Sequence, residues 1–163
     1  MRLPFIQPKR DFAIAPLRRG DSAALSTLHR EDFARPWSAA EFAALLAQET
    51  VFGYAARESG RPGASMAGFA LARLAAGEAE ILSIAVARSC RRLGLGRQLM
   101  DAVLRELHKQ RAEALFLEVD ETNAPAIALY RRLGFRDVGK RPGYYATGGG
   151  QKSGALIMRR DLR

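Results

Sequence analysis

Arg91-Arg92-Leu93-Gly94-Leu95-Gly96 lies between an apolar segment, residues 81–86, and a long run with helical spacing. The pattern predicts a strand, a short glycine turn and then a helix. In such a turn several backbone N–H groups and the positive end of the helix point into one concavity. Neighbouring arginines can add charge-assisted hydrogen bonds to an anion. The stretch therefore predicts a pyrophosphate site, and a tight basic turn without a ligand is the alternative.

The glycine spacing excludes two common phosphate-binding motifs. A dinucleotide-binding fingerprint needs a third glycine three residues after Gly96, where this sequence has Leu99. A P-loop needs Gly-Lys followed by Ser or Thr, and no such step follows the turn. The early part of the chain also lacks a strand, glycine loop and helix in succession, so a dinucleotide fold is not expected.

The segments around this turn predict a single mixed α/β domain over residues 1–163, with antiparallel strands in front and parallel pairing around the long helix. Asp21 and Asn123 are predicted to cap helices, and Ser38 and Glu41 have the spacing of a capping box. A glycine-rich loop is expected over residues 142–154. Strands are predicted at 12–17, 51–57, 66–74, 78–86, 114–119, 135–140 and 155–160, and helices over 21–30, from 38, over 94–110 and from 123.

Composition narrows the function classes. The 163 residues are 48% hydrophobic and 26% charged, which is typical of a globular protein. No apolar run is long enough to cross a membrane, and residues 1–10 lack the apolar centre of a signal peptide. Cys90 is the single cysteine, which predicts a cytoplasmic protein without a disulfide. Because His29 and His108 are far from each other and from Cys90 in sequence, no metal site is predicted.

The net charge of +9 comes almost entirely from arginine. Such a field favours anionic partners in general, whether RNA, an acidic protein or a phosphorylated cofactor. Basic residues that alternate with aromatic ones would indicate a surface on which RNA bases stack, and that pattern is absent. Direct binding of nucleic acid is therefore not expected to be the main function, and most of these arginines are expected to solvate the surface.

Arg91-x-x-Gly94-x-Gly96 resembles the Arg/Gln-x-x-Gly-x-Gly/Ala motif of the GCN5-related N-acetyltransferase superfamily, which wraps the pyrophosphate of coenzyme A. Leu117-Glu118-Val119, residues 123–130 and Leu133-Gly134-Phe135 are similar to the RimI group of that superfamily. Those bacterial enzymes acetylate the N-terminal alanine of a ribosomal protein. Two further pieces agree with the group, Arg35-Pro36-Trp37-Ser38 and Tyr144-Tyr145.

The resemblance implies a mixed, mostly antiparallel sheet whose central parallel strands splay apart, flanked by helices, with a bulge in the fourth strand. It implies acetyl-CoA as the cofactor, Glu118 as the general base and Tyr130 as the general acid that protonates the leaving thiolate. Backbone N–H groups near Ala85 and Val86 would meet the oxyanion. The cofactor-binding residues that it implies are Ile84, Ala85, Val86, Arg91, Arg92, Leu93, Gly94, Leu95, Gly96, Arg97 and Asn123, and the substrate-binding residues are Trp37, Tyr144 and Tyr145.

Each of these residues also has a structural interpretation. Glu118 could end a buried strand in solvent, Tyr130 could be part of a helical core stripe, and Trp37 could be ordinary aromatic packing. Cys90 is expected to be a passive loop residue. The sequence departs from the RimI pattern at Arg88, Cys90, Asp120, Glu121 and Ser153-Gly154. These departures leave the acetyl-CoA residues in place and change the charges around the expected peptide entrance.

Three functions compete on the sequence. The first is an acetyl-CoA-dependent transferase acting on a protein N-terminus, a ribosomal protein among the candidates. The second is the same fold acting on a small-molecule amine. The third is a non-catalytic module that binds RNA or protein through its arginines.

Overall fold

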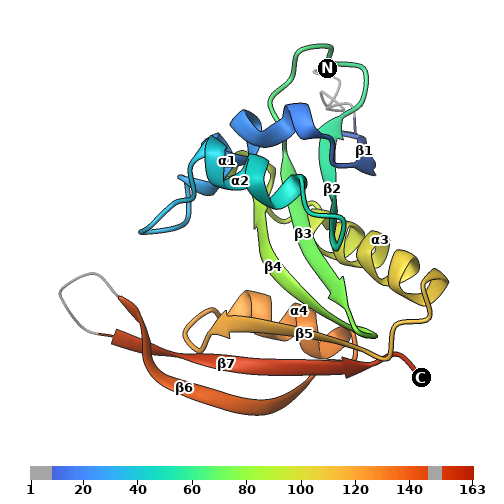
Figure 1. Cartoon of the computed structure of the whole chain (residues 1–163). Helices are drawn as coiled ribbons and strands as arrows, with labels where there is room; N and C mark the ends of the chain where they lie inside the picture. Colours follow the sequence, from blue (N-terminus) through green and yellow to red (C-terminus); the bar gives the residue numbers. More distant parts are fainter. Residues whose placement is uncertain (1–8, 147–151) are drawn as a thin grey trace, which may run out of the picture.

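The computed structural model describes residues 9–146 and 152–163, which fold around one seven-stranded sheet with the order β1-β2-β3-β4-β5-β7-β6 (Figure 1). Neighbouring strands are antiparallel except β4 and β5, which are parallel. The predicted mixed, mostly antiparallel sheet is therefore confirmed. The strands are β1 (Phe12–Pro16), β2 (Val51–Glu58), β3 (Gly68–Ala75), β4 (Glu78–Val86), β5 (Ala114–Asp120), β6 (Arg136–Ala146) and β7 (Lys152–Asp161).

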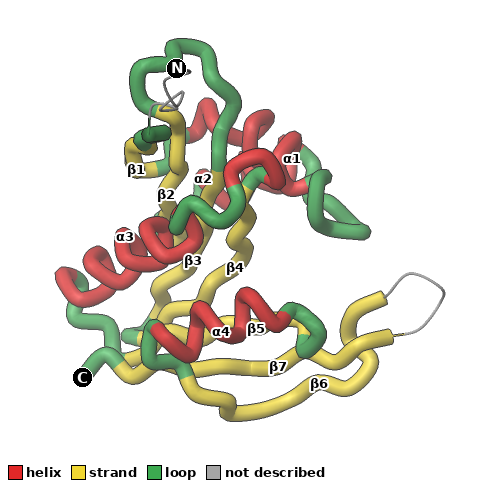
Figure 2. The backbone as a smooth tube through the Cα atoms, turned by 180° about the vertical axis from the view of Figure 1, so that it is seen from behind, coloured by secondary structure: helices red, strands yellow, loops and turns green. Residues whose placement is uncertain are grey.

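Helices cover both faces of this sheet. Helices α1 (Ser22–His29) and α2 (Ala39–Leu46) lie on the face turned to the viewer in Figure 1, and α3 (Leu95–Lys109) and α4 (Ala124–Arg132) lie on the opposite face, which Figure 2 shows. Two short 3-10 turns, η1 (Arg19–Asp21) and η2 (Arg88–Cys90), complete the described elements. Helix α3 packs on the sheet because its apolar residues recur every three or four positions. The buried residues of α3 are Leu95, Leu99, Met100, Ala102, Val103, Leu104 and Leu107. Across 9–146 and 152–163, no helix has the length and apolar character that a membrane span needs.

Two of the three predicted helix caps are confirmed. Ser38 Oγ accepts the Glu41 N–H (3.1 Å) while the Glu41 carboxylate accepts the Ser38 N–H (2.7 Å). Asn123 Oδ1 accepts the Ala126 N–H at 3.3 Å. The prediction for Asp21 is wrong. Its carboxylate accepts instead from the Arg18 N–H and from Arg57, each at 2.8 Å, because η1 precedes α1 and places Asp21 beside β2.

The prediction of a glycine-rich loop over residues 142–154 is also wrong in its bounds. Strand β6 continues to Ala146 and β7 begins at Lys152. The register between the two strands shifts between Arg141 and Tyr145, so the intervening proline and glycine are taken up by a bulge. This is physically reasonable because β6 is an edge strand, where proline and irregular pairing are tolerated.

The central strands splay as the family resemblance implies. Strands β4 and β5 pair only at Glu78–Glu80 with Ala114–Phe116, and beyond those three pairs they separate toward the left of Figure 1. Between β3 and β4, Leu71 lies opposite Ser83 while Ala72 lies opposite Ile81, so Leu82 is an extra residue on β4. This is the expected bulge in the fourth strand. Beyond Glu80, β4 therefore has a backbone edge that β5 does not cover.

An aromatic cluster on the α1/α2 face surrounds a buried histidine. The His29 ring, 2% exposed, stacks on Phe33 (centroids 3.9 Å apart) and Trp37 (5.0 Å) and meets the edge of Phe42. His29 Nδ1 accepts the Trp37 N–H at 3.0 Å, which requires that nitrogen to be unprotonated. Burial lowers the pKa of His29 from its ordinary value of 6.5. The neutral ring therefore holds the segment between α1 and α2 in place.

Acidification is expected to destabilise this cluster. Because the folded-state pKa of His29 is lowered, the unfolded chain binds more protons below about pH 6.5, so the contribution is complete above that pH and is lost as the pH falls toward the folded-state pKa. Thermal unfolding measured from pH 8 to pH 5 should show this loss in the wild type. In His29→Asn, which keeps an acceptor near Nδ1 but cannot titrate, the loss should be smaller. Equal pH dependence in both proteins would contradict this account.

Candidate active site

The glycine turn has the geometry that an anion site requires. Gly94 is the N-cap of α3 with φ of +78°, a left-handed conformation that glycine adopts without strain. A Cβ on Gly96 would lie 3.3 Å from Leu129 Cδ2, so α4 approaches the first turn of α3 closely. The first backbone N–H groups of α3 have no acceptor within the helix. They belong to Leu95, Gly96 and Arg97, three of the predicted cofactor-binding residues.

The basic residues before this turn are tied to the end of α1. Arg91 forms an ion pair with Asp32 (2.5 Å), and its Nε donates to the Val86 carbonyl (3.4 Å). The Arg88 N–H donates to the Glu31 carboxylate at 3.1 Å. These contacts place the Arg91 guanidinium beside the last residue of β4. Arg92 and Leu93 are exposed, and Arg97 lies 3.9 Å from Asp101 on the helix surface.

The uncovered edge of β4 presents alternate backbone groups. The Ala87 N–H donates to the Ala67 carbonyl of the segment before β3 (2.8 Å). Because backbone groups alternate along an antiparallel pair, those of Ala85 also face β3, while those of Ile84 and Val86 face the splay. The Val86 carbonyl that accepts from Arg91 agrees with this direction. Of the two predicted oxyanion donors, Val86 therefore has its N–H on the open edge and Ala85 has its N–H in the ladder with β3.

Glu118 lies on the α1/α2 face of the sheet. Directly paired residues point to the same face, and the pairs Glu80 with Arg73 and Glu80 with Phe116 connect β5 to β3. Arg73 donates to Gln48 at the end of α2, which identifies the face, and Glu118 follows Phe116 by two residues. The Glu118 side chain is 31% exposed and forms an ion pair with Arg141 of β6 (3.1 Å).

Tyr130 comes from the opposite face. It lies on α4, is 6% exposed and packs beside Phe135 with ring centroids 5.8 Å apart. The burial agrees with a core stripe, and a donor role for the phenol is compatible with it. The two residues predicted to exchange protons with the reactants therefore approach the splayed strands from opposite sides.

The predicted substrate-binding residues are only partly brought together. Trp37 is half-buried against His29 and Phe42, so the alternative of aromatic packing is realised. Tyr144 is 54% exposed and lies under the Arg141 guanidinium, 5.7 Å from the ring centroid. The Tyr145 side chain lies outside the described part of the structure. Arg141, which contacts both Glu118 and Tyr144, was not singled out by the sequence because a lone arginine carries no pattern.

The model of the acetyltransferase (GNAT) family matches residues 22–135 of this chain. The chain belongs to this family. It is 36% identical over 145 residues to the [ribosomal protein bS18]-alanine N-acetyltransferase of Escherichia coli, covering 89% of this chain and 94% of that protein. The crystal structure of the ribosomal-protein-S18-alanine N-acetyltransferase from E. coli superimposes with a TM-score of 0.84 at 34% identity, covering 93% of this chain and 94% of that one. Arabidopsis thaliana NAA60 in complex with acetyl-CoA shares the fold, with a TM-score of 0.82 at 22% identity over 93% and 98% of the two chains.

Glu121 and Gly154, two departures from the RimI pattern in this acetyltransferase, contact each other. The Gly154 N–H donates to the Glu121 carboxylate (2.9 Å), and a Cβ at Gly154 would lie 3.1 Å from Glu121 Oε2. Asp120 accepts both the N–H and the hydroxyl of Thr122, at 2.9 and 2.8 Å. Although burial opposes ionisation, these bonds hold the pKa of Asp120 below its ordinary value. Both acidic residues therefore organise the turn between β5 and α4.

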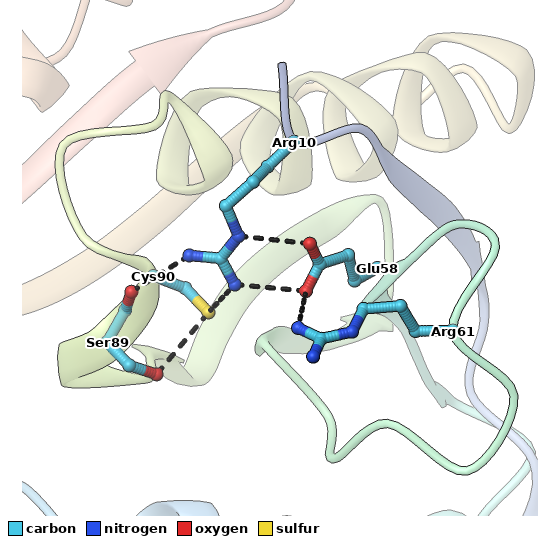
Figure 3. A network of polar contacts seen from close by, with 5 residues as sticks. All are labelled: Arg10, Glu58, Arg61, Ser89 and Cys90. Atoms are coloured by element: carbon cyan, nitrogen blue, oxygen red, sulfur yellow. Dashed lines mark hydrogen bonds and ion pairs between the residues drawn. The ribbon is translucent and has the colours of Figure 1, made fainter. Parts of the chain in front are cut away.

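Cys90 lies apart from the splay, in a cavity of about 770 Å³ between α1, the β2–β3 connection and η2. Figure 3 shows that Arg10 joins Cys90 Sγ (3.6 Å) and the Ser89 carbonyl (3.2 Å) to the carboxylate of Glu58. The Arg10 hydrogen bonds, helped by Arg61, lower the pKa of Glu58. The thiol is buried and lies in a structural network, as expected of a passive residue. No group of three or more metal-ligating side chains is present in the described ranges.

The glycine turn generates a prediction with a matched control. Gly94 and Gly60 both have positive φ (+78° and +74°), and a Cβ at either position would meet nothing within 4 Å. Either change to alanine should cost about 1 kcal/mol of stability through backbone strain. Gly94→Ala should in addition weaken acetyl-CoA binding, measured by calorimetry, because the turn must relax. Gly60→Ala should leave that affinity unchanged, and equal affinities in the two variants would exclude the turn as the phosphate site.

Proposed function

We propose that this acetyltransferase moves an acetyl group from acetyl-CoA to the α-amine of a protein N-terminus. The observation that carries the proposal is the splay between β4 and β5, with the glycine turn and Tyr130 on one face and Glu118 on the other. A donor and an amine can then approach one point from opposite sides of the sheet. The similarity to enzymes named for acetylating a ribosomal-protein alanine supports an N-terminal substrate.

The glycine turn and the open edge of β4 have groups suited to bind acetyl-CoA. A left-handed Gly94, the uncapped N–H groups of α3 and the nearby Arg91 form a site for its pyrophosphate. The outward backbone groups of Ile84 and Val86 suit an extended chain with amide groups, which pantetheine is. Arg92 and Leu93 belong to the same turn, and the proposal keeps Asn123, whose side chain caps α4, as a further contact to the cofactor. Acetyl-CoA supplies an activated acyl group as a thioester.

The protons can be assigned to residues of this chain. An α-ammonium has a pKa of about 7.7–8.0, so it must lose a proton before the nitrogen can attack. Glu118 takes that proton, directly or through a water, and Arg141 holds the carboxylate in position. As the C–N bond forms and the C–S bond breaks, the Val86 N–H stabilises the carbonyl oxygen. The Tyr130 hydroxyl donates a proton to the departing sulfur. The nitrogen then loses its second proton, which returns the phenolate of Tyr130 to a phenol, and Glu118 releases the first proton to solvent.

A peptide substrate would reach Glu118 across the α1/α2 face. Trp37 lies on the α1–α2 side of this approach and Tyr144 on the β6 side. The similar proteins include further N-α-acetyltransferases, and they therefore do not favour a small-molecule amine or a non-catalytic role. One of them, from Sulfurisphaera tokodaii, is 44% identical over 69 residues, which are 42% of this chain and 41% of that protein. We also propose a cytoplasmic location, as the single cysteine suggests.

Replacing the base tests this assignment. Glu118→Gln should lower kcat for a peptide with N-terminal alanine by about 10²–10⁴-fold, since general-base help is lost, while the affinity for acetyl-CoA stays the same. Glu113→Gln, at the residue just before the same strand, should leave kcat unchanged. Steady-state kinetics and calorimetry give both quantities. A parallel loss of acetyl-CoA binding in Glu118→Gln would mean that the residue is structural.

Replacing the acid tests the other half. Tyr130→Phe keeps the ring that packs on Phe135 and removes the hydroxyl, so the fold and the acetyl-CoA affinity should persist. The rate of the chemical step, measured in single-turnover experiments, should fall by about 10²-fold or more. Tyr54→Phe, at a half-buried tyrosine of β2, serves as the control. A Tyr130→Phe enzyme with wild-type rates would remove Tyr130 from the reaction.

A further inference from the structure

Ser83 carries a buried hydroxyl that has no partner among residues 9–146 and 152–163. The residue is 7% exposed, and its Oγ forms no hydrogen bond with that part of the chain. A buried polar group in this condition destabilises the folded state, and such groups are uncommon in native structures. Ser26, another buried serine, shows the ordinary solution, because its hydroxyl donates to the Trp37 carbonyl at 2.9 Å. The Ser83 hydroxyl therefore requires a partner that the described residues do not supply.

Strand register places Ser83 on the same face as Glu118. Ser83 lies opposite Leu71 of β3, and Leu71 shares its face with Arg73 two residues later. Arg73 is opposite Glu80, and Glu80 is opposite Phe116, which precedes Glu118 by two residues. The bulge at Leu82 produces this placement. Without the extra residue, position 83 would point to the α3 face, since one residue reverses the side-chain direction.

The splay brings these two residues to its two borders. Glu80 and Phe116 are the last paired residues, Ser83 follows three residues later on β4, and Glu118 follows two residues later on β5. Both side chains thus lie just beyond the point of divergence, on the face from which the amine approaches. Glu118 is held by Arg141 from the β6 side, which leaves the direction toward β4 for a ligand.

We propose that Ser83 Oγ is the hydrogen-bond acceptor that positions the substrate α-amine, an inference that rests on the proposed function. A primary amine that has given one proton to Glu118 keeps two N–H bonds and a lone pair. Ser83 Oγ accepts a hydrogen bond from one amine N–H and turns the lone pair toward the acetyl carbon. Its own hydrogen is donated to the unprotonated oxygen of the Glu118 carboxyl group or to a water between them. The hydroxyl neither gains nor loses a proton overall. The bound amine thus supplies the hydrogen-bond partner that the Ser83 hydroxyl lacks among the described residues.

Ser83→Ala tests the proposal together with Ser83→Thr and Cys90→Ala. For a peptide with N-terminal alanine, Ser83→Ala should lower kcat/KM by about tenfold, the effect of one lost hydrogen bond, mainly through KM. Its acetyl-CoA affinity should equal that of the wild type, and its Tm should be equal or higher because an unpaired buried hydroxyl has been removed. Ser83→Thr keeps the hydroxyl and should recover most of the activity. Cys90→Ala truncates another small buried side chain outside the site and should keep wild-type kinetics.

The outcomes distinguish the role of Ser83 from the proposed function. Wild-type kcat/KM in Ser83→Ala overturns the role of Ser83 and leaves the proposed function intact. Activity that falls together with Tm or with acetyl-CoA affinity, without recovery in Ser83→Thr, also overturns it, because the residue is then structural. A wild-type protein that binds acetyl-CoA but acetylates no peptide refutes the proposed function, and the assignment of Ser83 with it.

Discussion

The structure depends on the parting of β4 and β5 after three residue pairs. Backbone groups in the middle of a sheet normally bond to both neighbours, so a parting of central strands leaves polar groups that need other partners. Part of that need is met within the chain, since the Val86 carbonyl accepts from Arg91. The outward backbone groups of Ile84 and Val86 remain for the proposed acetyl-CoA site, between the glycine turn and the carboxylate of Glu118 on the opposite face. The bulge at Leu82 and the orphaned hydroxyl of Ser83 belong to the same departure from regular pairing.

Two sets of contacts join the faces on which donor and amine are expected. Arg91 and Arg88, next to the glycine turn, bind Asp32 and Glu31 at the end of α1. From there the chain runs past the buried ring of His29, which accepts the Trp37 N–H. The segment between α1 and α2 is therefore anchored at one end by ion pairs and at the other by aromatic packing. On the β6 side, Arg141 connects Glu118 to Tyr144. These contacts hold the borders of the amine approach without the help of a ligand.

The sequence predicts the parts of this fold that short-range patterns determine. The turn from Arg91 to Gly96, the capping box at Ser38 and the meander of β2, β3 and β4 follow from local spacing, and the family resemblance supplies the splay. Prediction from the sequence fails where contacts between residues far apart in the chain determine the structure. The Asp21 side chain accepts a hydrogen bond from Arg57, 36 residues away, and so does not cap α1. The edge position of β6 allows proline and glycine within a strand. The pairing of Arg141 with Glu118 and the face of Ser83 depend on strand register and a bulge, neither of which a single sequence displays.

The central claim is that the splay delivers acetyl to an α-amine. The most direct measurement incubates the protein with acetyl-CoA and a peptide that has a free N-terminal alanine and one internal lysine, and locates the added acetyl group by fragment mass spectrometry. The account predicts acetyl on the α-amine. Acetyl on the lysine alone would keep the reaction and contradict the N-terminal substrate. No product, with acetyl-CoA binding demonstrated, would contradict the claim that the splay acts on peptides.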